Sequence, residues 1–324
     1  MKRITELQEL FNAELKLHSF TGTPGELYEP FGYMLGLGGK RLRPVLLLHT
    51  CELFCGDPMP AMPQAMAVEL FHNFTLIHDD IMDHAPLRRG LKTVHEQFNH
   101  ATAILSGDAM LVMAYKFLVQ ADAARLPQLL DLFNDTAIKV CEGQQYDMNF
   151  ENAAGLTVAD YLRMIELKTA VLLAAALNFG AVIGGANSDD ARYLYDFGRE
   201  LGISFQLRDD WLDSFGSAQQ VGKQQGGDIL QNKKTFLMIE AMQQGDKKLR
   251  AALQHWYTVR EFNPEEKIAS VISLFNSLGI SERTLEETNR HFRLAMSFLD
   301  RLGIPEDKKE TLRSFSESLL HRDK

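Results

Sequence analysis

The sequence has few of the residues that build disulfide frameworks and linkers. Its 324 residues include only three cysteines, ten prolines and two tryptophans. Cys51, Cys55 and Cys141 are too few for a disulfide scaffold, and Cys51 and Cys55 lack the second ligand pair of a structural zinc site. We therefore predict three reduced thiols in a cytoplasmic protein.

The sequence also shows no sign of a linker or a basic run, and we expect no secretory signal. It has no Pro/Ser-rich run, charge block or low-complexity tract, and its net charge of -9 argues against nucleic-acid binding. Met1 to Arg3 leads directly into an acidic stretch, so no apolar signal segment is visible. With 45% hydrophobic residues the chain can bury a sizeable core. We predict one domain over residues 1–324.

Only one long apolar run occurs, from Ala170 to Ala186, and Asn178 is its single polar interruption. At 17 residues it reaches only the lower limit for crossing a bilayer, and it has no flanking aromatic belt. A helix that is apolar on all sides also suits the centre of a large helical protein. We predict a core helix and no transmembrane segment.

Strand signals are missing, whereas helix signals run along the whole chain. Thr157 to Asp160 has the pattern of a capping box, Asn263-Pro264 that of an N-cap followed by proline, and Pro305-Glu306 that of another helix start. The chain is therefore predicted to be all-α, a large single-domain helical bundle with a central substrate cavity. Predicted breaks between its helices lie at Thr21 to Gly25, Gly36 to Gly39, Cys55 to Pro60, Arg88 to Leu91, Gly184 to Asp190 and Gly216 to Gly227.

One acidic pattern occurs twice, as Asp79-Asp80-Ile81-Met82-Asp83 and as Asp209-Asp210-Trp211-Leu212-Asp213. Each copy ends a predicted long helix, Ala61 to Asp83 and Asp189 to Asp213, so its carboxylates share one helix face. Like charges at this spacing repel, and Mg²⁺ is the cation that best suits oxygen-only coordination. A single copy would fit a solvated helix face, but the repeat favours metal binding.

Cations and glycines accompany the acidic patterns. Gly38 to Pro44 combines glycines with three cations, and Arg88-Arg89 follows the first acidic pattern, so that two anions could be held. The Gly216 to Gly227 segment is predicted to close over a ligand. Each residue alone would also fit a solvated surface. Further donors before and after the second acidic pattern are Lys168, Thr169, Gln206, Lys223 and Lys233.

In this order and spacing, the motifs resemble those of the trans-prenyltransferases of the polyprenyl synthetase family, over nearly the whole chain. No motif residue expected of an active member is missing. The matching motifs are Gly38 to Pro44, Glu69 to His72, His78 to Asp83, Leu87 to Gly90, Gly143-Gln144, Lys168-Thr169, Phe205 to Asp213, Gly222-Lys223 and Lys233 to Thr235.

The resemblance implies a role for each motif residue. Mg²⁺, as three ions when substrate is bound, would be held by Asp79, Asp83 and Asp209, with Asp80, Asp210 and Asp213 as further candidates. The diphosphate of an allylic substrate would be bound by Arg88, Lys168, Thr169, Gln206, Lys223 and Lys233. The diphosphate of isopentenyl diphosphate would be bound by Gly39, Lys40, Arg43, His72 and Arg89.

The implied reaction is a head-to-tail condensation of isopentenyl diphosphate with an allylic prenyl diphosphate, by a homodimer. Loss of diphosphate from an allylic carbon leaves a carbocation, so catalysis requires cations at the leaving group and exclusion of water. No side-chain base is evident, which suits the departing diphosphate as proton acceptor. The residues expected to be catalytic are Asp79, Asp83, Arg88, Lys168, Asp209 and Lys223.

Product length is expected to depend on residues that precede the first acidic pattern. With a rise of about 1.5 Å per residue, Phe74 lies roughly 7.5 Å and Phe71 about 12 Å along the helix from Asp79. An aromatic at Phe74 with the small Thr75 beside it resembles family members that make geranylgeranyl diphosphate (C20), with farnesyl diphosphate (C15) next. The two rings also fit ordinary core packing.

Three other kinds of protein share part of this motif series. A class I terpene cyclase also uses an Asp-rich helix end, but it has no use for a second anion site. A non-catalytic subunit of a heteromeric synthase would have lost motif residues. A protein that only binds divalent ions would not interleave cations with its carboxylates, and an assay for diphosphate release separates it from the enzyme.

Overall fold

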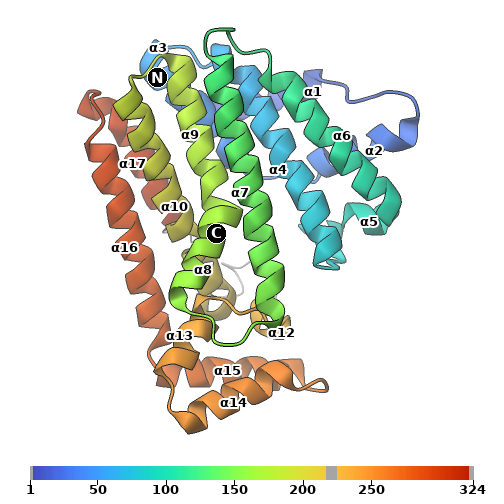
Figure 1. The fold of residues 1–324 in the computed structure, drawn as a ribbon, viewed down its shortest axis with the longest axis vertical. Coiled ribbons are helices and arrows are strands. Elements are labelled where there is room, and N and C mark those ends of the chain that lie inside the picture. Colours follow the sequence, from blue (N-terminus) through green and yellow to red (C-terminus); the bar gives the residue numbers. More distant parts are fainter. Residues whose placement is uncertain (1–2, 217–224, 321–324) are drawn as a thin grey trace. The chain divides into compact units, whose positions relative to one another are not determined.

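The computed structural model describes residues 3–216 and 225–320, and these residues are almost entirely helical (Figure 1). The prediction of an all-α fold is therefore confirmed. The first helices are α1 (Ile4–Leu17), α2 (Gly25–Gly36), α3 (Leu42–Cys55), η1 (Met59–Ala61), α4 (Met62–Met82), α5 (Val94–Gln97), α6 (His100–Leu118), α7 (Leu126–Asn152) and α8 (Val158–Ile165). They are followed by the π-helix η2 (Glu166–Ala170), α9 (Val171–Gly184), α10 (Ser188–Phe215), α12 (Gly227–Leu230), α13 (Phe236–Gln244), α14 (Lys247–Thr258), α15 (Pro264–Ser277), α16 (Ile280–Asp300) and α17 (Glu306–Leu320).

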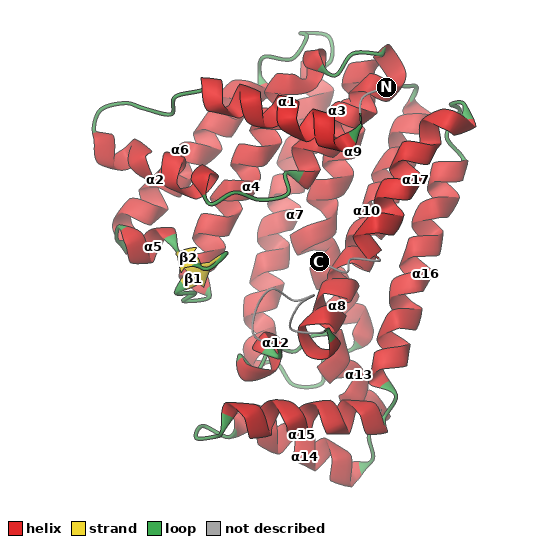
Figure 2. Cartoon of the chain, turned by 180° about the vertical axis from the view of Figure 1, so that it is seen from behind, coloured by secondary structure: helices red, strands yellow, loops and turns green. Residues whose placement is uncertain are grey.

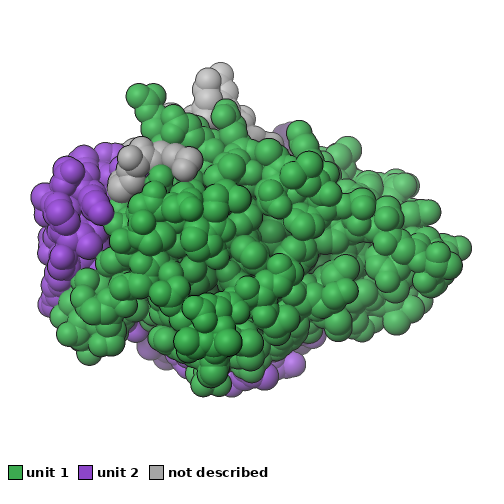
Figure 3. All heavy atoms as spheres, turned by 90° about the horizontal axis from the view of Figure 1, so that it is seen from above, with its two compact units in different colours: residues 1–135, 175–195 green, residues 136–174, 196–324 purple. Residues whose placement is uncertain are grey.

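The chain divides into two compact units, which Figure 3 colours separately. Unit 1 comprises residues 1–135 and 175–195, and unit 2 comprises residues 136–174 and 196–324. The boundaries fall inside α7, α9 and α10. The expectation of a single domain over the whole chain stays a prediction, and each unit is described by itself.

Unit 1 is built on helices whose backbones approach closely. α4 pairs extensively with α6, and a Cβ atom at Gly107 of α6 would lie 2.4 Å from Nε2 of His78. On the other side, a Cβ at Gly180 of α9 would lie 2.2 Å from the Leu47 carbonyl oxygen of α3, and one at Gly184 would lie 2.8 Å from that of Cys51. These glycines let the helices that carry the site pack without intervening side chains.

The apolar run of the sequence forms α9, and its side chains are mostly buried. By length and composition, two helical segments could cross a membrane, His100–Leu118 and Val158–Gly184. In the second, 78% of the apolar window is buried inside the protein, as in a core helix; in the first, 33% is buried.

Unit 2 has two apolar clusters on either side of α13. Phe236 and Ile239 of α13 pack into one cluster with Tyr161 and Leu207, whereas Leu237 and Met238 belong to the other. The second cluster includes Ile229, Leu253, Val271, Phe275 and Ile280, from helices α12, α14, α15 and α16. α12, which follows the second acidic pattern, therefore packs against the apolar side chains of α14, α15 and α16.

The predicted helix starts are confirmed. Thr157 and Asp160 form a reciprocal capping box at α8, in which the Thr157 N–H donates to Oδ2 of Asp160 at 2.9 Å. Oδ1 of Asn263 accepts from the N–H groups of Glu265 and Glu266 at 2.9 and 3.1 Å, with proline at the first position of α15. α17 begins directly after Pro305.

The sequence pattern predicts no strand, yet the described residues contain one small hairpin (Figure 2). Strands β1 (Leu87–Arg88) and β2 (Leu91–Lys92) pair in antiparallel fashion. Two residues per strand are too few to show an alternating pattern, so the prediction of helices alone missed it. The hydroxyl of Tyr33 on α2 donates to the Lys92 carbonyl at 2.6 Å and fastens the hairpin.

Candidate active site

The first acidic pattern lies at the end of α4 in unit 1. As predicted, the helix ends there, and the Asp83 N–H donates to the Asp79 carbonyl at 2.8 Å. The three carboxylates are not equivalent, because Asp80 is buried, Asp79 is half-buried and Asp83 is exposed. The outer two of the three are therefore the more accessible to a ligand.

Asp80 is held by Arg88 of the hairpin. Nε and Nη2 of Arg88 donate to the two carboxylate oxygens at 2.8 and 2.7 Å, and Nη2 lies 3.6 Å from Oδ2 of Asp79. Burial raises the pKa of Asp80, although the two hydrogen bonds from Arg88 oppose the rise. Asp80 thus orients the Arg88 guanidinium beside Asp79. This role differs from metal binding, which the sequence had suggested for Asp80.

The turn of the hairpin separates the two adjacent arginines. Arg89 and Gly90 both have positive φ, 54° and 78°, as in a type I′ turn between Arg88 and Leu91. Whereas Arg88 reaches Asp80, the Arg89 guanidinium donates to the Gly38 carbonyl. The two side chains therefore serve different parts of the site.

Arg89 rests against the glycine turn before α3. Gly39 has a φ of 137°, and a Cβ atom there would lie 2.9 Å from both terminal nitrogens of Arg89. Burial, together with the charges of Arg41 and Arg88, lowers the pKa of Arg89. A glycine at position 39 is needed for the backbone conformation and for the approach of the guanidinium.

His72 and Arg43 join the same group of side chains. Nη1 of Arg43 lies 3.2 Å from Nε2 of His72. Burial and then the charges of Arg43, Arg88 and Arg89 hold the pKa of His72 well below its usual value, so the ring is neutral and Nε2 accepts from Arg43. The neighbouring Lys40 has an exposed side chain, and its carbonyl accepts from Nε2 of Gln8 at 3.1 Å. Unit 1 thus brings most of the predicted isopentenyl diphosphate residues together.

Arg41, the third cation of this motif, has a different task that the sequence did not reveal. It is buried, with a φ of 50°, and donates from Nη1 to Oε1 of Glu69 at 2.5 Å and from Nη2 to the Leu35 carbonyl at 2.6 Å. Glu69 also accepts from Nδ2 of Asn73 at 3.0 Å. The ion pair connects the start of α3 to the middle of α4. Nothing in the sequence pattern distinguishes Arg41 from the cations on either side of it.

The predicted chain-length residues lie on α4. Phe71 is buried, and its ring centroid lies 5.7 Å from that of Phe74 and 5.2 Å from that of Phe133. Phe74 is half-buried and contacts the ring of His78 edge-on at 4.7 Å. Thr75 donates to the His72 carbonyl at 2.8 Å. The rings form a ladder below the first acidic pattern.

In unit 2, Lys168 and Thr169 lie on the π-helix η2, a distortion that often marks functional sites. Nζ of Lys168 donates to Oδ2 of Asp147 at 2.7 Å, and the Thr169 hydroxyl donates to Oε1 of Gln206 at 3.3 Å. A Cβ atom at Gly143 would lie 2.3 Å from the backbone nitrogen of Lys168. Gly143 therefore lets α7 approach the π-helix.

The second acidic pattern lies near the end of α10, as predicted. Asp210 is buried and accepts from the Tyr161 hydroxyl and from Nε2 of Gln206, the latter at 3.0 Å. Burial and the charge of Asp228 raise the pKa of Asp210 to about 8. Oδ2 of Asp213 accepts from the Asp228 N–H at 2.9 Å, whereas Asp209 is half-buried.

The predicted cations after α10 are only partly covered by the structure. Lys233 is exposed, and its N–H donates to the Asp228 carbonyl at 2.9 Å. Lys234 donates instead to the carbonyls of Glu151 and Ala153 at 2.9 and 2.6 Å. Lys223 and most of the Gly216 to Gly227 segment lie outside the described residues.

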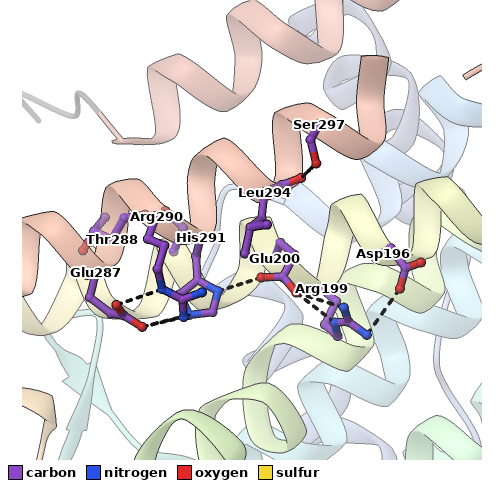
Figure 4. A network of polar contacts seen from close by, with 10 residues as sticks. Asp196, Arg199, Glu200, Glu287, Thr288, Arg290, His291, Leu294 and Ser297 are labelled. Carbon is purple, nitrogen blue, oxygen red and sulfur yellow. Dashed lines mark hydrogen bonds and ion pairs between the residues drawn. The ribbon is translucent and has the colours of Figure 1, made fainter. Parts of the chain in front are cut away.

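α10 is anchored by a polar network near its middle (Figure 4). Oε2 of Glu200 lies 2.6 Å from Nδ1 of His291 on α16, and Oε1 accepts from Nη2 of Arg199 at 2.9 Å. Glu287 lies 3.3 Å from Nε2 of the same histidine. Although burial opposes protonation, the hydrogen bonds to Glu200 and Glu287 raise the pKa of His291.

Among residues 3–216 and 225–320, the structure has no group of three or more His, Cys, Asp or Glu side chains that could hold a metal ion. The donor chemistry still fits Mg²⁺, because the accessible groups of both acidic patterns are carboxylates. The predicted metal ligands stay a prediction.

Comparisons with known proteins agree with the motif series. The family model described as polyprenyl synthetase matches residues 24–275. Geranylgeranyl diphosphate synthase of Methanosarcina mazei is 42% identical over 226 residues, 69% of this chain and 70% of the relative. A short chain isoprenyl diphosphate synthase of Methanothermobacter thermautotrophicus is 35% identical over 302 residues, 93% and 92% of the two chains. Geranylfarnesyl diphosphate synthase of Natronomonas pharaonis is 36% identical over 260 residues, 75% and 76%.

Solved structures give the same result. A geranylgeranyl pyrophosphate synthase superposes with a TM-score of 0.94 at 42% identity, covering 100% of both chains. The geranylgeranyl pyrophosphate synthase of Corynebacterium glutamicum, in complex with isoprenyl diphosphate and magnesium, has a TM-score of 0.83 at 27% identity and covers 98% and 97%. The family uses divalent metal and isoprenyl diphosphate substrates. This chain belongs to the polyprenyl synthetase family and is a prenyltransferase, an isoprenyl diphosphate synthase that makes short-chain prenyl diphosphates.

Proposed function

We propose that the protein catalyses the Mg²⁺-dependent head-to-tail condensation of isopentenyl diphosphate with an allylic prenyl diphosphate, and that the main product is geranylgeranyl diphosphate. The observation that carries this proposal is the divergence of Arg88 and Arg89 at the hairpin turn. One guanidinium faces the acidic helix end and the other faces the glycine turn, so that two anionic substrates have separate cations.

The isopentenyl diphosphate site lies in unit 1. Arg43, Arg89 and Lys40 supply positive charge, and the neutral ring of His72 supplies a donor that does not depend on protonation. Gly39 leaves room for the Arg89 guanidinium. A diphosphate suits such a site, because bidentate guanidinium groups bind its oxygens and the ammonium adds a point charge.

The allylic diphosphate is assigned to the acidic patterns and to their cations. Asp79, Asp83 and Asp209 are the metal ligands we favour, with three Mg²⁺ ions when substrate is bound. Asp80, Asp210 and Asp213 are supporting groups, because each accepts hydrogen bonds from a neighbour within its own unit. The direct contacts to the diphosphate are assigned to Arg88, Lys168, Thr169, Gln206, Lys223 and Lys233.

The chemistry of ionisation explains this concentration of charge. Mg²⁺ would supply a Lewis acid that neutralises charge on the departing diphosphate. Arg88 and Lys168 stabilise that charge from fixed positions, because Asp80 and Asp147 hold their side chains. The isopentenyl double bond attacks the allylic cation, and the proton then lost passes to the departing diphosphate.

Product length is proposed to be set by the ladder of rings below Asp79. Phe74 is the first ring of the ladder, and Thr75 leaves space beside it. Relatives named for geranylgeranyl and for geranylfarnesyl diphosphate lie at similar identity, so C20 rests on Phe74 and not on the relatives alone.

Incubation of the enzyme with radiolabelled isopentenyl diphosphate and dimethylallyl, geranyl or farnesyl diphosphate tests the proposal. We expect mainly C20 from the wild type, longer products from Phe74→Ala and C15 or shorter products from Thr75→Phe. Truncation of a fully packed Phe costs up to roughly 3 to 5 kcal/mol, and less is expected at the half-buried Phe74, so folding is checked first by circular dichroism. An unchanged distribution in folded Phe74→Ala would remove the basis for C20.

We further propose that the enzyme is a cytoplasmic homodimer. α6 exposes a row of apolar side chains, with Leu105 at 60% and Val112 at 61% exposure, and Ile104 at 44%. Such a row on one helix is typical of a surface that pairs with another chain. Sedimentation equilibrium at micromolar concentration should give the mass of two chains, and the mass of one chain would contradict the proposal.

A further inference from the structure

Lys267 on α15 is a fully buried lysine. Its Nζ donates to Oδ1 of Asn232 at 2.5 Å, lies 4.2 Å from the ring centroid of Phe262 and 5.8 Å from that of Tyr257. Among the residues that the structure describes, no carboxylate is in ion-pair contact with it. Burial lowers the pKa of Lys267.

A buried ammonium without a carboxylate is costly, because the charge has left water. Cation–π interactions with the rings of Phe262 and Tyr257 offset part of this free-energy cost. Methionine would fill the same space without a charge and would suit the adjacent apolar cluster of Ile229, Val271 and Phe275. What the lysine adds over methionine is therefore its hydrogen bond to Asn232.

Asn232 lies at the turn between α12 and the predicted diphosphate-binding residue Lys233. Its φ is 57°, and its N–H donates to the Ile229 carbonyl at 3.2 Å. The next N–H, that of Lys233, donates to the Asp228 carbonyl at 2.9 Å. The conformation of Asn232 thus sets the direction in which the chain presents Lys233.

The opposite end of α12 is fastened to the second acidic pattern. The Gly226 N–H donates to the Asp213 carbonyl at 2.7 Å, and the Asp228 N–H donates to Oδ2 of Asp213 at 2.9 Å. α12 packs mainly against α15, the helix that carries Lys267. Segment 226–233 is therefore held at one end by Asp213 and at the other by Lys267.

We propose that Lys267 is a positioning residue for the allylic diphosphate, because through Asn232 it fixes the turn that presents Lys233. This inference rests on the proposed role of Lys233 in binding that diphosphate. It differs from a purely structural role in one respect, namely that removal of the ammonium should weaken binding of the allylic diphosphate without lowering the stability of the fold.

The test is Lys267→Met in the full-length enzyme with Mg²⁺. We expect KM for the allylic diphosphate to rise up to about tenfold, since one hydrogen bond is worth up to about that factor, and KM for isopentenyl diphosphate to stay unchanged. The thermal midpoint should stay the same or rise, because a buried charge has been replaced by an apolar side chain. Lys248→Met, on the exposed surface of α14, is the matched control and should leave both KM values unchanged.

Asn232→Gly removes the acceptor and keeps a residue that tolerates positive φ. It should reproduce the allylic defect, and the double variant should be no worse than the more affected single variant. Multiplying effects, equal rises in both KM values, or an unchanged allylic KM in the folded variants would each overturn the inference.

The failure of the underlying assignment would look different. If Lys233→Ala leaves the allylic KM unchanged, the role of Lys233 is wrong. Hydrogen exchange at the amides of residues 226–233 measures the positioning itself. Faster exchange in Lys267→Met than in Lys248→Met supports the hold of Lys267 on the turn, and equal exchange overturns it.

Discussion

α4 and α10 end in the same acidic pattern, yet they are anchored by different chemistry. Each carries a buried glutamate, Glu69 ten residues before Asp79 and Glu200 nine residues before Asp209. Glu69 accepts from the buried guanidinium of Arg41, whereas Glu200 accepts from a histidine on α16 and from Arg199 beside it. The helix carrying the first pattern thus depends on a permanent cation, and the other depends partly on a titratable one.

The middle aspartates repeat this contrast. Asp80 accepts two hydrogen bonds from Arg88, while Asp210 accepts from the uncharged groups of Tyr161 and Gln206. A guanidinium keeps its charge at any pH at which the protein is folded. An imidazole, or a carboxyl group whose pKa is raised towards neutrality, does not. Identical sequence patterns therefore sit in environments that respond differently to pH.

The largest expected effect is on the two helix ends that we propose to bind metal. Asp79→Ala and Asp209→Ala should each lower kcat about a thousandfold, because each removes a carboxylate whose metal contact acts on the transition state. EDTA should abolish turnover, and added Mg²⁺ should restore it. Full turnover after chelation would show that neither pattern acts through a metal, and the comparison would lose its functional meaning.

The second prediction concerns the glutamate anchors. Glu69→Gln should lower the free energy of unfolding by roughly 3 kcal/mol, because it leaves the guanidinium of Arg41 buried without a counter-charge. Glu200→Gln should cost less, since Arg199 is partly exposed and His291 can become neutral. Urea unfolding at pH 7 measures both changes. Equal losses would mean that the two anchors are equivalent.

The third prediction concerns the adjacent arginines. Arg88→Ala should mainly raise KM for the allylic substrate and Arg89→Ala should mainly raise KM for isopentenyl diphosphate, each by roughly 30-fold for the loss of a charge-assisted hydrogen bond. Lysine at either position should restore little, because a point charge does not reproduce a guanidinium fork. If steady-state kinetics show the same defect in both variants, the two anion sites are not separate.

The smallest effect is the pH dependence of the α10 anchor. The raised pKa of His291 means that its protonated form stabilises the fold below pH about 6.5, and that this contribution is lost as pH rises through the folded-state value. Hydrogen bonds from His291 and Arg290 lower the pKa of Glu287 to about 2, so that residue stays ionised above pH 6. The charged groups that face the ring are Glu200, Glu287, Arg199 and Arg290.

His291→Gln should therefore cost about 1 kcal/mol at pH 6 and little at pH 9, as measured by urea unfolding at the two values. Glu69→Gln serves as the control, because its cost should be the same at both. A cost of His291→Gln that does not change with pH would contradict the contrast between a titratable and a permanent anchor.

The sequence predicted features that depend on local patterns. The helix ends expected at Asp83 and Asp213 lie within two residues of the observed ends at Met82 and Phe215. The capping box at Thr157 and the start at Pro264 likewise follow from residues within one or two turns. Adjacency of Arg88 and Arg89 indicated only that two anions could be held, and the family resemblance implied the two substrates, which stay a prediction. The turn that separates the arginines was missed because its strands are only two residues long.

Other features could not be predicted, because they depend on contacts between distant residues. Arg41 finds Glu69 across 28 positions, and Tyr161 finds Asp210 across 49. Nothing in the spacing of Asp213 indicated that one oxygen would accept from the Asp228 N–H. The π-helix at Lys168 likewise has no sequence signal, although Gly143, which permits its approach to α7, was noted as a motif residue.

The β-hairpin has a consequence for how this segment can change in length. Because the two-residue turn of Arg89 and Gly90 directs the two guanidinium groups apart, one residue added or lost between Leu87 and Lys92 would change the turn and the direction of both groups. Both arginines would still be present, but Arg88 would no longer face Asp80, nor Arg89 the Gly38 carbonyl. Insertions and deletions of single residues should therefore be as damaging here as replacement of either arginine, in a loop whose exposed position would otherwise tolerate them.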